Sequence, residues 1–146
     1  MTTSLTADPF NLQRFVVAQE PVYDEVRAEL RSGEKVSHWM WFIFPQLRGL
    51  GSSSMAQKYG VSSTAEALAY LQHPVLGQRL RECTRLVNDV QGRSLHQIFG
   101  SPDDMKFRSS MTLFAHVSPT TSEFIEALKK YCRGESDPRT LGLLKR

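Results

Sequence analysis

Two segments of the chain place polar side chains among apolar ones, and the first is the stretch 102–117. It contains Lys106, Ser109 and Ser110 between aromatic and aliphatic residues. Buried polar groups need partners, and a buried lysine needs a carboxylate or a ligand. One interpretation is a capped helix whose hydroxyls bond back to its own carbonyls. The other is the floor of a polar pocket, built from Lys106 and Ser109 or Ser110.

The second segment is Ser-His-Trp-Met-Trp-Phe-Ile-Phe-Pro-Gln, residues 37–46. Aromatic side chains bury large areas, so most of them are predicted to lie in the core. Two tryptophans followed by Gln46 and a glycine-containing loop also suit the wall of a pocket for a planar ring. A pocket of this kind requires Trp41, Gln46, Tyr59, Lys106 and Ser110 to converge on one cavity.

The loop 48–54 (Arg-Gly-Leu-Gly-Ser-Ser-Ser) leads into an expected helix near Met55. Backbone N–H groups around Gly49 and Gly51 could bind an anion, with the Arg48 guanidinium as a further donor. The loop lacks the Gly-Lys-Ser/Thr of a P-loop, and no clear strand precedes it. An ordinary turn is the alternative interpretation.

Further charged candidates lie outside these segments. Glu66 and Asp104 are the carboxylates proposed for catalysis, together with Lys106, and Arg79 is a candidate ligand-binding cation. If Arg79 is structural, an ion pair with Glu66 or Asp104 is expected. No Ser-His-Asp or Cys-His set can be named from spacing.

Prolines and glycines mark where helices should start and stop. A capping residue precedes proline in Asp8-Pro9, His73-Pro74, Ser101-Pro102, Ser118-Pro119 and Asp137-Pro138, which predicts five helix starts. Ser63 and Glu66 have the spacing of a capping box. Glycines 33, 92, 100 and 134 follow the helical stretches.

Between these marks the apolar residues recur with helical periodicity. Leu76, Leu80, Cys83 and Val87 alternate steps of four and three. Residues 39–44 are too few to distinguish a strand from a buried helical turn. The pattern predicts an all-α, compact single-domain bundle of six or more helices, with a flexible tail at 1–7 and one helical domain at 8–146.

Composition narrows the class of protein. The 146 residues are 40% hydrophobic and 23% charged, as in a globular domain. The sequence has no signal peptide and no apolar run long enough for a membrane, which predicts a cytoplasmic protein. Two cysteines without Cys-x-x-Cys spacing predict reduced thiols and no metal site, and no cofactor is expected. The net charge of +3 is spread along the chain, which argues against nucleic-acid binding.

Several motifs resemble the domain-of-unknown-function family 1810, a family of uncharacterised bacterial proteins. They are residues 8–15 (Asp-Pro-Phe-Asn-Leu-Gln-Arg-Phe), 37–46, 49–52, Tyr59, 69–77, 104–114 and 137–141. The resemblance covers nearly the whole chain and implies a compact all-helical fold, with no established activity. Some members carry the label calpastatin, but that calpain inhibitor is a long disordered repeat protein. The family is also distantly similar to YbiA-like proteins, helical domains linked to NAD and ADP-ribose chemistry.

These observations lead to two functional hypotheses. One is binding of a nucleotide or ADP-ribose-like small molecule, extending to N-glycosidic hydrolysis. That reaction needs a carboxylate from Glu66 or Asp104, and phosphate-binding cations from Arg48, Arg79 and Lys106. The alternative is a non-catalytic helical protein-interaction module, which predicts an exposed apolar patch and a protein partner that the sequence does not identify.

Overall fold

The computed structural model describes residues 7–119 and 121–145. The predicted tail, apart from Ala7, therefore lies outside the described residues. The described ranges contain ten α-helices and no strand: α2 (Gln13–Gln19), α3 (Tyr23–Ser32), α4 (Met40–Ile43), α5 (Ser54–Tyr59), α6 (Thr64–Gln72), α7 (Leu76–Asp89), α8 (Leu95–Phe99), α9 (Asp103–His116), α10 (Glu123–Cys132) and α11 (Pro138–Leu144). The prediction of an all-α bundle is confirmed. Of the helices described, none combines the length and apolarity that a bilayer crossing needs.

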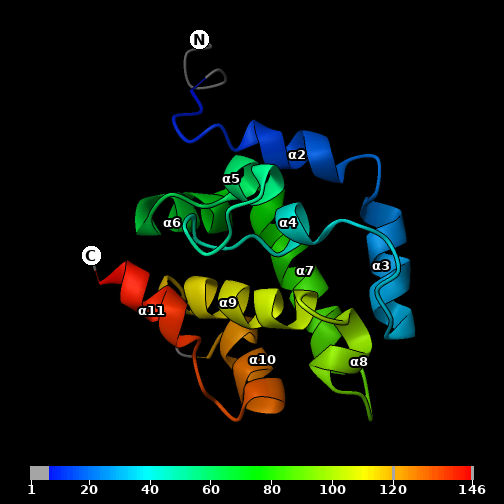
Figure 1. Cartoon of the computed structure of the whole chain (residues 1–146). Helices are drawn as coiled ribbons and strands as arrows, with labels where there is room; N and C mark the ends of the chain where they lie inside the picture. Colours follow the sequence, from blue (N-terminus) through cyan, green and yellow to red (C-terminus); the bar gives the residue numbers. More distant parts are fainter. Residues whose placement is uncertain (1–6, 120, 146) are drawn as a thin grey trace.

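Helix α9 is the central element of the bundle. It contacts α6, α8, α10 and α11, and runs across the middle of the molecule in Figure 1. Phe107 and all residues 109–114 are buried. A helix with apolar residues on several faces is expected to be covered on several sides, and this expectation is confirmed. Helix α7 packs against α3, α6 and α10, through the predicted stripe from Leu76 to Val87.

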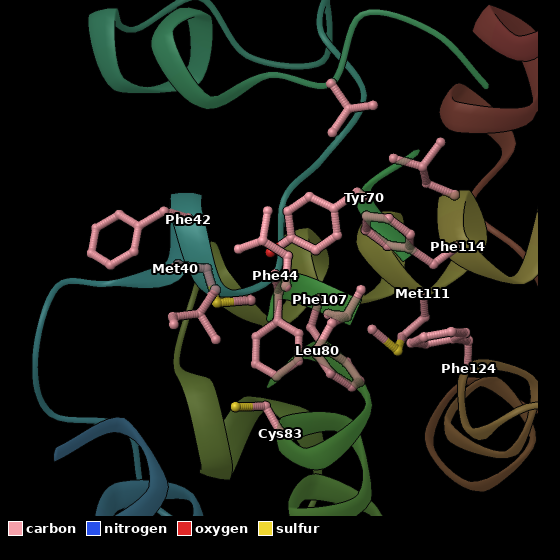
Figure 2. Close-up of a cluster of buried hydrophobic side chains, with 14 of the residues drawn as sticks. Met40, Phe42, Phe44, Tyr70, Leu80, Cys83, Phe107, Met111, Phe114 and Phe124 are labelled. Carbon is pink, nitrogen blue, oxygen red and sulfur yellow. The ribbon is translucent and has the colours of Figure 1, made fainter. Parts of the chain in front are cut away.

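Aromatic rings fill the space between α4, α7 and α9, as Figure 2 shows. The Phe44 and Phe107 rings meet edge to face with centroids 5.0 Å apart. The Tyr70 and Phe114 rings lie 5.4 Å apart. Residues 40–43 form one helical turn, so the segment that was ambiguous between strand and helix is helical. Its burial in this core explains why a short apolar run showed no clear period.

Four of the five predicted helix starts are wrong. After Asp8-Pro9 and His73-Pro74 the helices begin only at Gln13 and Leu76, with Leu12 and Val75 in the N-cap positions. The helix after Ser118-Pro119 begins later, because Pro119 opens a turn and Ser122 caps α10 by accepting a hydrogen bond from the Ile125 N–H. In Ser101-Pro102 the proline itself takes the N-cap position, and no side chain caps the helix. The prediction at Asp137-Pro138 is confirmed, since the Asp137 carboxylate caps α11.

The segment from Leu47 to Val61 forms a loop whose two ends are joined. These residues make an isolated parallel β-bridge, in which the Arg48 N–H donates to the Val61 carbonyl at 2.7 Å. Gly60 allows the ends to approach, because a Cβ there would lie 2.8 Å from the Ala56 carbonyl oxygen. The loop carries α5 and presents residues 50–53 to the first turns of α9.

Candidate functional site

A cleft of about 370 Å³ lies between this loop, the N-terminal half of α9 and the start of α11. Figure 1 shows α11 beside α9, at the end of the molecule where the chain terminates. We call this hollow the loop–α9 cleft. Its lining residues are Gln46, Leu50, Gly51, Ser52, Ser53, Ala56, Pro102, Met105, Lys106, Arg108, Ser109, Asp137 and Arg139.

Three cations line the cleft, and two of them are weakly neutralised. Lys106 Nζ lies 3.6 Å from an oxygen of Asp103, whose other oxygen binds Lys35 at 2.8 Å. The Arg139 guanidinium donates to the Leu50 carbonyl at 2.9 Å and meets no carboxylate of the described residues within 4.0 Å. The third cation, Arg108, donates to the backbone carbonyls of residues 135 and 136 and lies 3.9 Å from a carboxylate oxygen of Glu135. The cleft therefore carries an excess of positive charge.

Among the described residues, Asp137 is the one acidic residue that lines the cleft. Its Oδ2 accepts from Ser109 Oγ at 3.1 Å, from the Thr140 N–H at 3.1 Å and from Thr140 Oγ1 at 2.6 Å. Ser109 also donates to the Met105 carbonyl at 3.1 Å, within its own helix. Both interpretations of Ser109 are thus present in one residue, which bonds back to α9 and lines a polar hollow.

A narrow slot adjoins the cleft and shares Gln46, Gly51 and Ala56 with it. Trp41 and Tyr59 line the slot, whose volume of about 10 Å³ is barely enough to hold one water molecule. A ring stacked on Trp41 would require the wall formed by Gly51 and Ala56 to move. Lys106 already covers one face of the indole, with Nζ 5.0 Å from its centroid.

The expected convergence of five residues is therefore realised in part. Gln46 and Lys106 line the cleft, Trp41 and Tyr59 line the slot, and Lys106 joins the two hollows through its contact with Trp41. Ser110 lines neither. It is completely buried, and its Oγ has no hydrogen-bond partner among the described residues.

Glu66 lies in a different environment. It is buried, and its Oε2 pairs with Arg14 at 2.9 Å. Its Oε1 accepts from the Ser62 N–H and Ser62 Oγ at 2.9 and 2.7 Å, while Ser63 caps α6. The predicted capping box is thus only half formed, because Glu66 bonds to the backbone of Ser62 and not to that of Ser63. Through these contacts Oε2 holds α2 to α6, and Oε1 fixes the turn that precedes α6.

The remaining charged candidates also lie away from the cleft. Asp104 lines a separate open hollow with Tyr131 and Cys132, and its Oδ2 is 3.3 Å from Nδ1 of His96. Arg79 pairs with Glu20 at 2.7 Å, so the expected ion pair with Glu66 or Asp104 is wrong. The reason is that α2 and not α6 supplies the carboxylate next to this end of α7.

Two residues of the glycine loop outside the cleft occupy other positions. Arg48 is exposed and donates to the Gly60 carbonyl at 3.1 Å. Gly49 has a φ of +106°, a conformation that favours glycine, and lines a hollow next to Leu143. Helix α5 is only one and a half turns long, and its N-cap Ser53 already accepts the Ala56 N–H. The loop contributes Leu50, Gly51, Ser52 and Ser53 to the cleft wall.

Sequence reasoning missed the acidic and basic residues that α11 contributes. Asp137 was interpreted only as a helix cap, and Arg139 was given no role. The signal that could have indicated them is the Asp-Pro-Arg-Thr-Leu motif at 137–141, which belongs to the family resemblance.

Neither a metal site nor an apolar docking patch is indicated. The described residues contain no group of three or more His, Cys, Asp or Glu side chains placed to hold a metal ion. Within residues 7–119 and 121–145, the exposed large hydrophobic residues are Val17, Val36, Leu68 and Met105, which come from four separate segments. Exposed apolar residues of this number are ordinary on a protein surface. The interaction module stays a prediction.

The fold and the cleft define an all-helical protein with a cationic hollow of ligand size. The family model described as "Protein of unknown function (DUF1810)" matches residues 9–144, and the chain belongs to this family. Among solved structures, the chain is similar to the conserved hypothetical protein Rv1873 from Mycobacterium tuberculosis. The two share 60% sequence identity with a TM-score of 0.93, over 95% of this chain and 99% of the other. A search of curated proteins finds no match.

Proposed function

We propose that the protein binds a small phosphate-bearing molecule of the nucleotide or ADP-ribose type in the loop–α9 cleft. The observation that carries this proposal is the set of three cations, Lys106, Arg108 and Arg139, around a hollow with one carboxylate. Arginine and lysine are the side chains that recognise phosphate oxygens. Because the protein's own carboxylates only weakly neutralise the charges of Lys106 and Arg139, an anionic ligand would neutralise them further.

The size and lining of the cleft suit this class of ligand. Pockets for small molecules span about 300–1,000 Å³, and the cleft is near the lower end of that range. Leu50, Ala56, Pro102 and Met105 supply an apolar surface for a base, while Ser52 and Ser53 supply hydroxyl groups. Trp41 acts in this arrangement by orienting Lys106, since the slot beside it does not admit a ring.

N-glycosidic hydrolysis requires a carboxylate near the sugar. Glu66 and Asp104, which were predicted to supply it, lie outside the cleft. The carboxylate that does line the cleft, Asp137, caps α11 and is held by Ser109 and Thr140. We therefore propose binding, and hydrolysis stays a prediction. Chromatographic detection of free base and sugar phosphate after incubation with a nucleotide would test it.

Isothermal titration calorimetry with ADP-ribose tests the proposal. We expect saturable binding to the wild-type protein, weakened about tenfold or more in Lys106→Gln and in Arg139→Gln, because each loses a charge-assisted hydrogen bond to phosphate. Binding should also weaken as salt is raised.

Lys129→Gln is the matched control, because Lys129 is an exposed lysine on α10 that does not line the cleft. Its affinity should equal that of the wild type. Absence of heat and of NMR shifts at millimolar ADP-ribose would overturn the proposal, as would equal loss of affinity in all three variants.

A further inference from the structure

The Asp137 carboxylate is out of place in a site that binds only an anion. It lines the cationic cleft, where its negative charge would repel a phosphate group. A helix cap does not by itself require a charged residue, since Asn and Ser cap equally well. The presence of a carboxylate among cations therefore calls for a group on the ligand that donates to it.

The carboxylate is held in a fixed orientation by two helices. Ser109 from α9 and Thr140 from α11 direct three hydrogen bonds to Oδ2, with the Ser109 hydroxyl hydrogen shared between Oδ2 and the Met105 carbonyl. The Asp137 N–H donates to Thr112 Oγ1 at 2.8 Å, which also anchors its backbone to α9. The other oxygen, Oδ1, accepts no hydrogen bond from the described residues. An ionised carboxylate can only accept, so Oδ1 is available to a donor on a ligand.

Position along the helices places this acceptor beside the cations. Ser109 follows Lys106 by three residues on α9, so the two side chains share one helix face. Arg139 follows Asp137 by two residues at the start of α11. A ligand that contacts both Asp137 and the cations must carry a hydrogen-bond donor a short distance from its phosphate, and the hydroxyl groups of a sugar phosphate meet this requirement.

We propose that Asp137 accepts hydrogen bonds from vicinal sugar hydroxyls, so that the cleft selects phosphorylated ribose compounds over their deoxy counterparts. This inference rests on the proposed function, and it names the part of the ligand that Asp137 recognises. Oδ1 alone can accept from both hydroxyls, because each carboxylate oxygen has two lone pairs. An acidic side chain likewise accepts a hydrogen bond from a ribose hydroxyl in dinucleotide sites.

The experiment compares ribose 5-phosphate with 2-deoxyribose 5-phosphate by calorimetry. The wild-type protein should bind ribose 5-phosphate about tenfold or more tightly, because the deoxy sugar loses a hydrogen bond to a charged acceptor. In Asp137→Asn the ratio should fall to about one. Asparagine keeps the cap, and its amide oxygen can accept from Ser109 and Thr140, while its NH₂ group replaces Oδ1 with a donor.

Each outcome separates this inference from the proposed function. Suppose that the wild type binds ADP-ribose but binds the two sugar phosphates with equal affinity, or binds neither of them. Recognition of the hydroxyl groups by Asp137 is then overturned, and the proposal of phosphate binding stands. A preference for ribose 5-phosphate that persists in Asp137→Asn also overturns the inference, because another group must then recognise the hydroxyls. If none of the three compounds binds, the proposed function fails as well. The wild-type ratio tests the inference even if the variant does not fold.

Discussion

The ammonium group of Lys106 lies over the indole ring of Trp41, 5.0 Å from its centroid, and connects α9 to α4 at the edge of the cleft. The same pairing recurs in the core, where Lys35 lies 5.1 Å from the centroid of Trp39. Each of the two tryptophans is thus covered by a lysine. Trp41 can therefore fix where the Lys106 charge is held.

Replacing Lys106 with Met should remove this contact while keeping an unbranched side chain. We expect a loss of about 0.5–1 kcal/mol in the free energy of unfolding, measured in urea, since the contact is partly exposed to solvent. The indole N–H resonance of Trp41 should shift in ¹⁵N spectra. Trp39 is the internal control, because its Nε1 donates to Glu29 at 3.0 Å, and its resonance should stay in place. Unchanged Trp41 signals would contradict the contact.

Glu66→Gln should destabilise the protein and leave ligand binding intact. Arg14 and Glu66 side chains are only 10% and 2% exposed, and removing one partner of such a pair leaves a buried charge unpaired. The expected loss is about 3 kcal/mol or more, measured by thermal or urea unfolding. A Glu66→Gln variant that is as stable as the wild type but no longer binds ADP-ribose would show instead that Glu66 takes part in ligand binding.

Gly60→Ala and Gly142→Ala should have opposite effects on stability. A Cβ on Gly60 would lie 2.8 Å from the Ala56 oxygen and 3.0 Å from the Arg48 Cα, and neither backbone atom can move cheaply. We expect a loss of about 1–3 kcal/mol by calorimetry. A Cβ on Gly142, inside α11, meets no atom within 4 Å, so alanine should stabilise the protein by about 0.5–1 kcal/mol. Equal effects would contradict the close approach at Gly60.

Glu29 should make the protein sensitive to acid. Burial alone would raise the pKa of Glu29, but hydrogen bonds from Ser37, the Val36 N–H and the Trp39 indole outweigh it and lower this pKa from 4.5 to about 2. A lowered folded-state pKa contributes stability above pH 4.5 that disappears as pH falls towards 2. In Glu29→Gln, unfolding free energies measured from pH 6 to pH 2 should be lower near neutrality and depend less on pH. An unchanged slope would exclude this role.

The two cysteines should differ in reactivity. Cys83 is completely buried, and burial raises the pKa of its thiol to about 12, so it carries almost no thiolate near neutrality. Cys132 is half-buried, and burial also raises the pKa of its thiol. Iodoacetamide at pH 8 should modify Cys132 slowly in the native protein, and Cys83 only in denaturant. Mass spectrometry of tryptic peptides distinguishes them, and rapid native labelling of Cys83 would contradict its burial.

The bundle could be predicted from the sequence because its signals are local. The stripe from Leu76 to Val87 and the several apolar faces of α9 follow from spacing alone. The positions where helices start are harder to predict, because a serine before a proline does not show whether the proline opens a helix or a turn. At Ser118-Pro119 the turn was formed, and Ser122 provides the cap.

The cleft could be predicted only in part, because it is made of segments distant in the chain. Lys106, Ser109, Gln46 and Gly51 were recognised from their unusual surroundings. Which carboxylate joins them depends on the docking of α11 against α9, and no local pattern encodes that contact. The Asp-Pro pattern at 137–138 predicts the cap of α11, but it does not predict that the same carboxylate lines the cleft.

The bridge between Leu47 and Val61 fixes the two ends of residues 48–60 next to each other. Tyr59 near one end packs into the core against Phe15 and Phe42, whereas residues 51–54 are exposed. Because the bridge holds the two ends together, lengthening this exposed part costs little, since doubling the length of a loop adds only about 0.6 kcal/mol of closure entropy. Related proteins could therefore change residues 51–54 without repacking their helices. Such exchanges would alter which molecules the cleft admits, so ligand preference and fold stability can evolve separately.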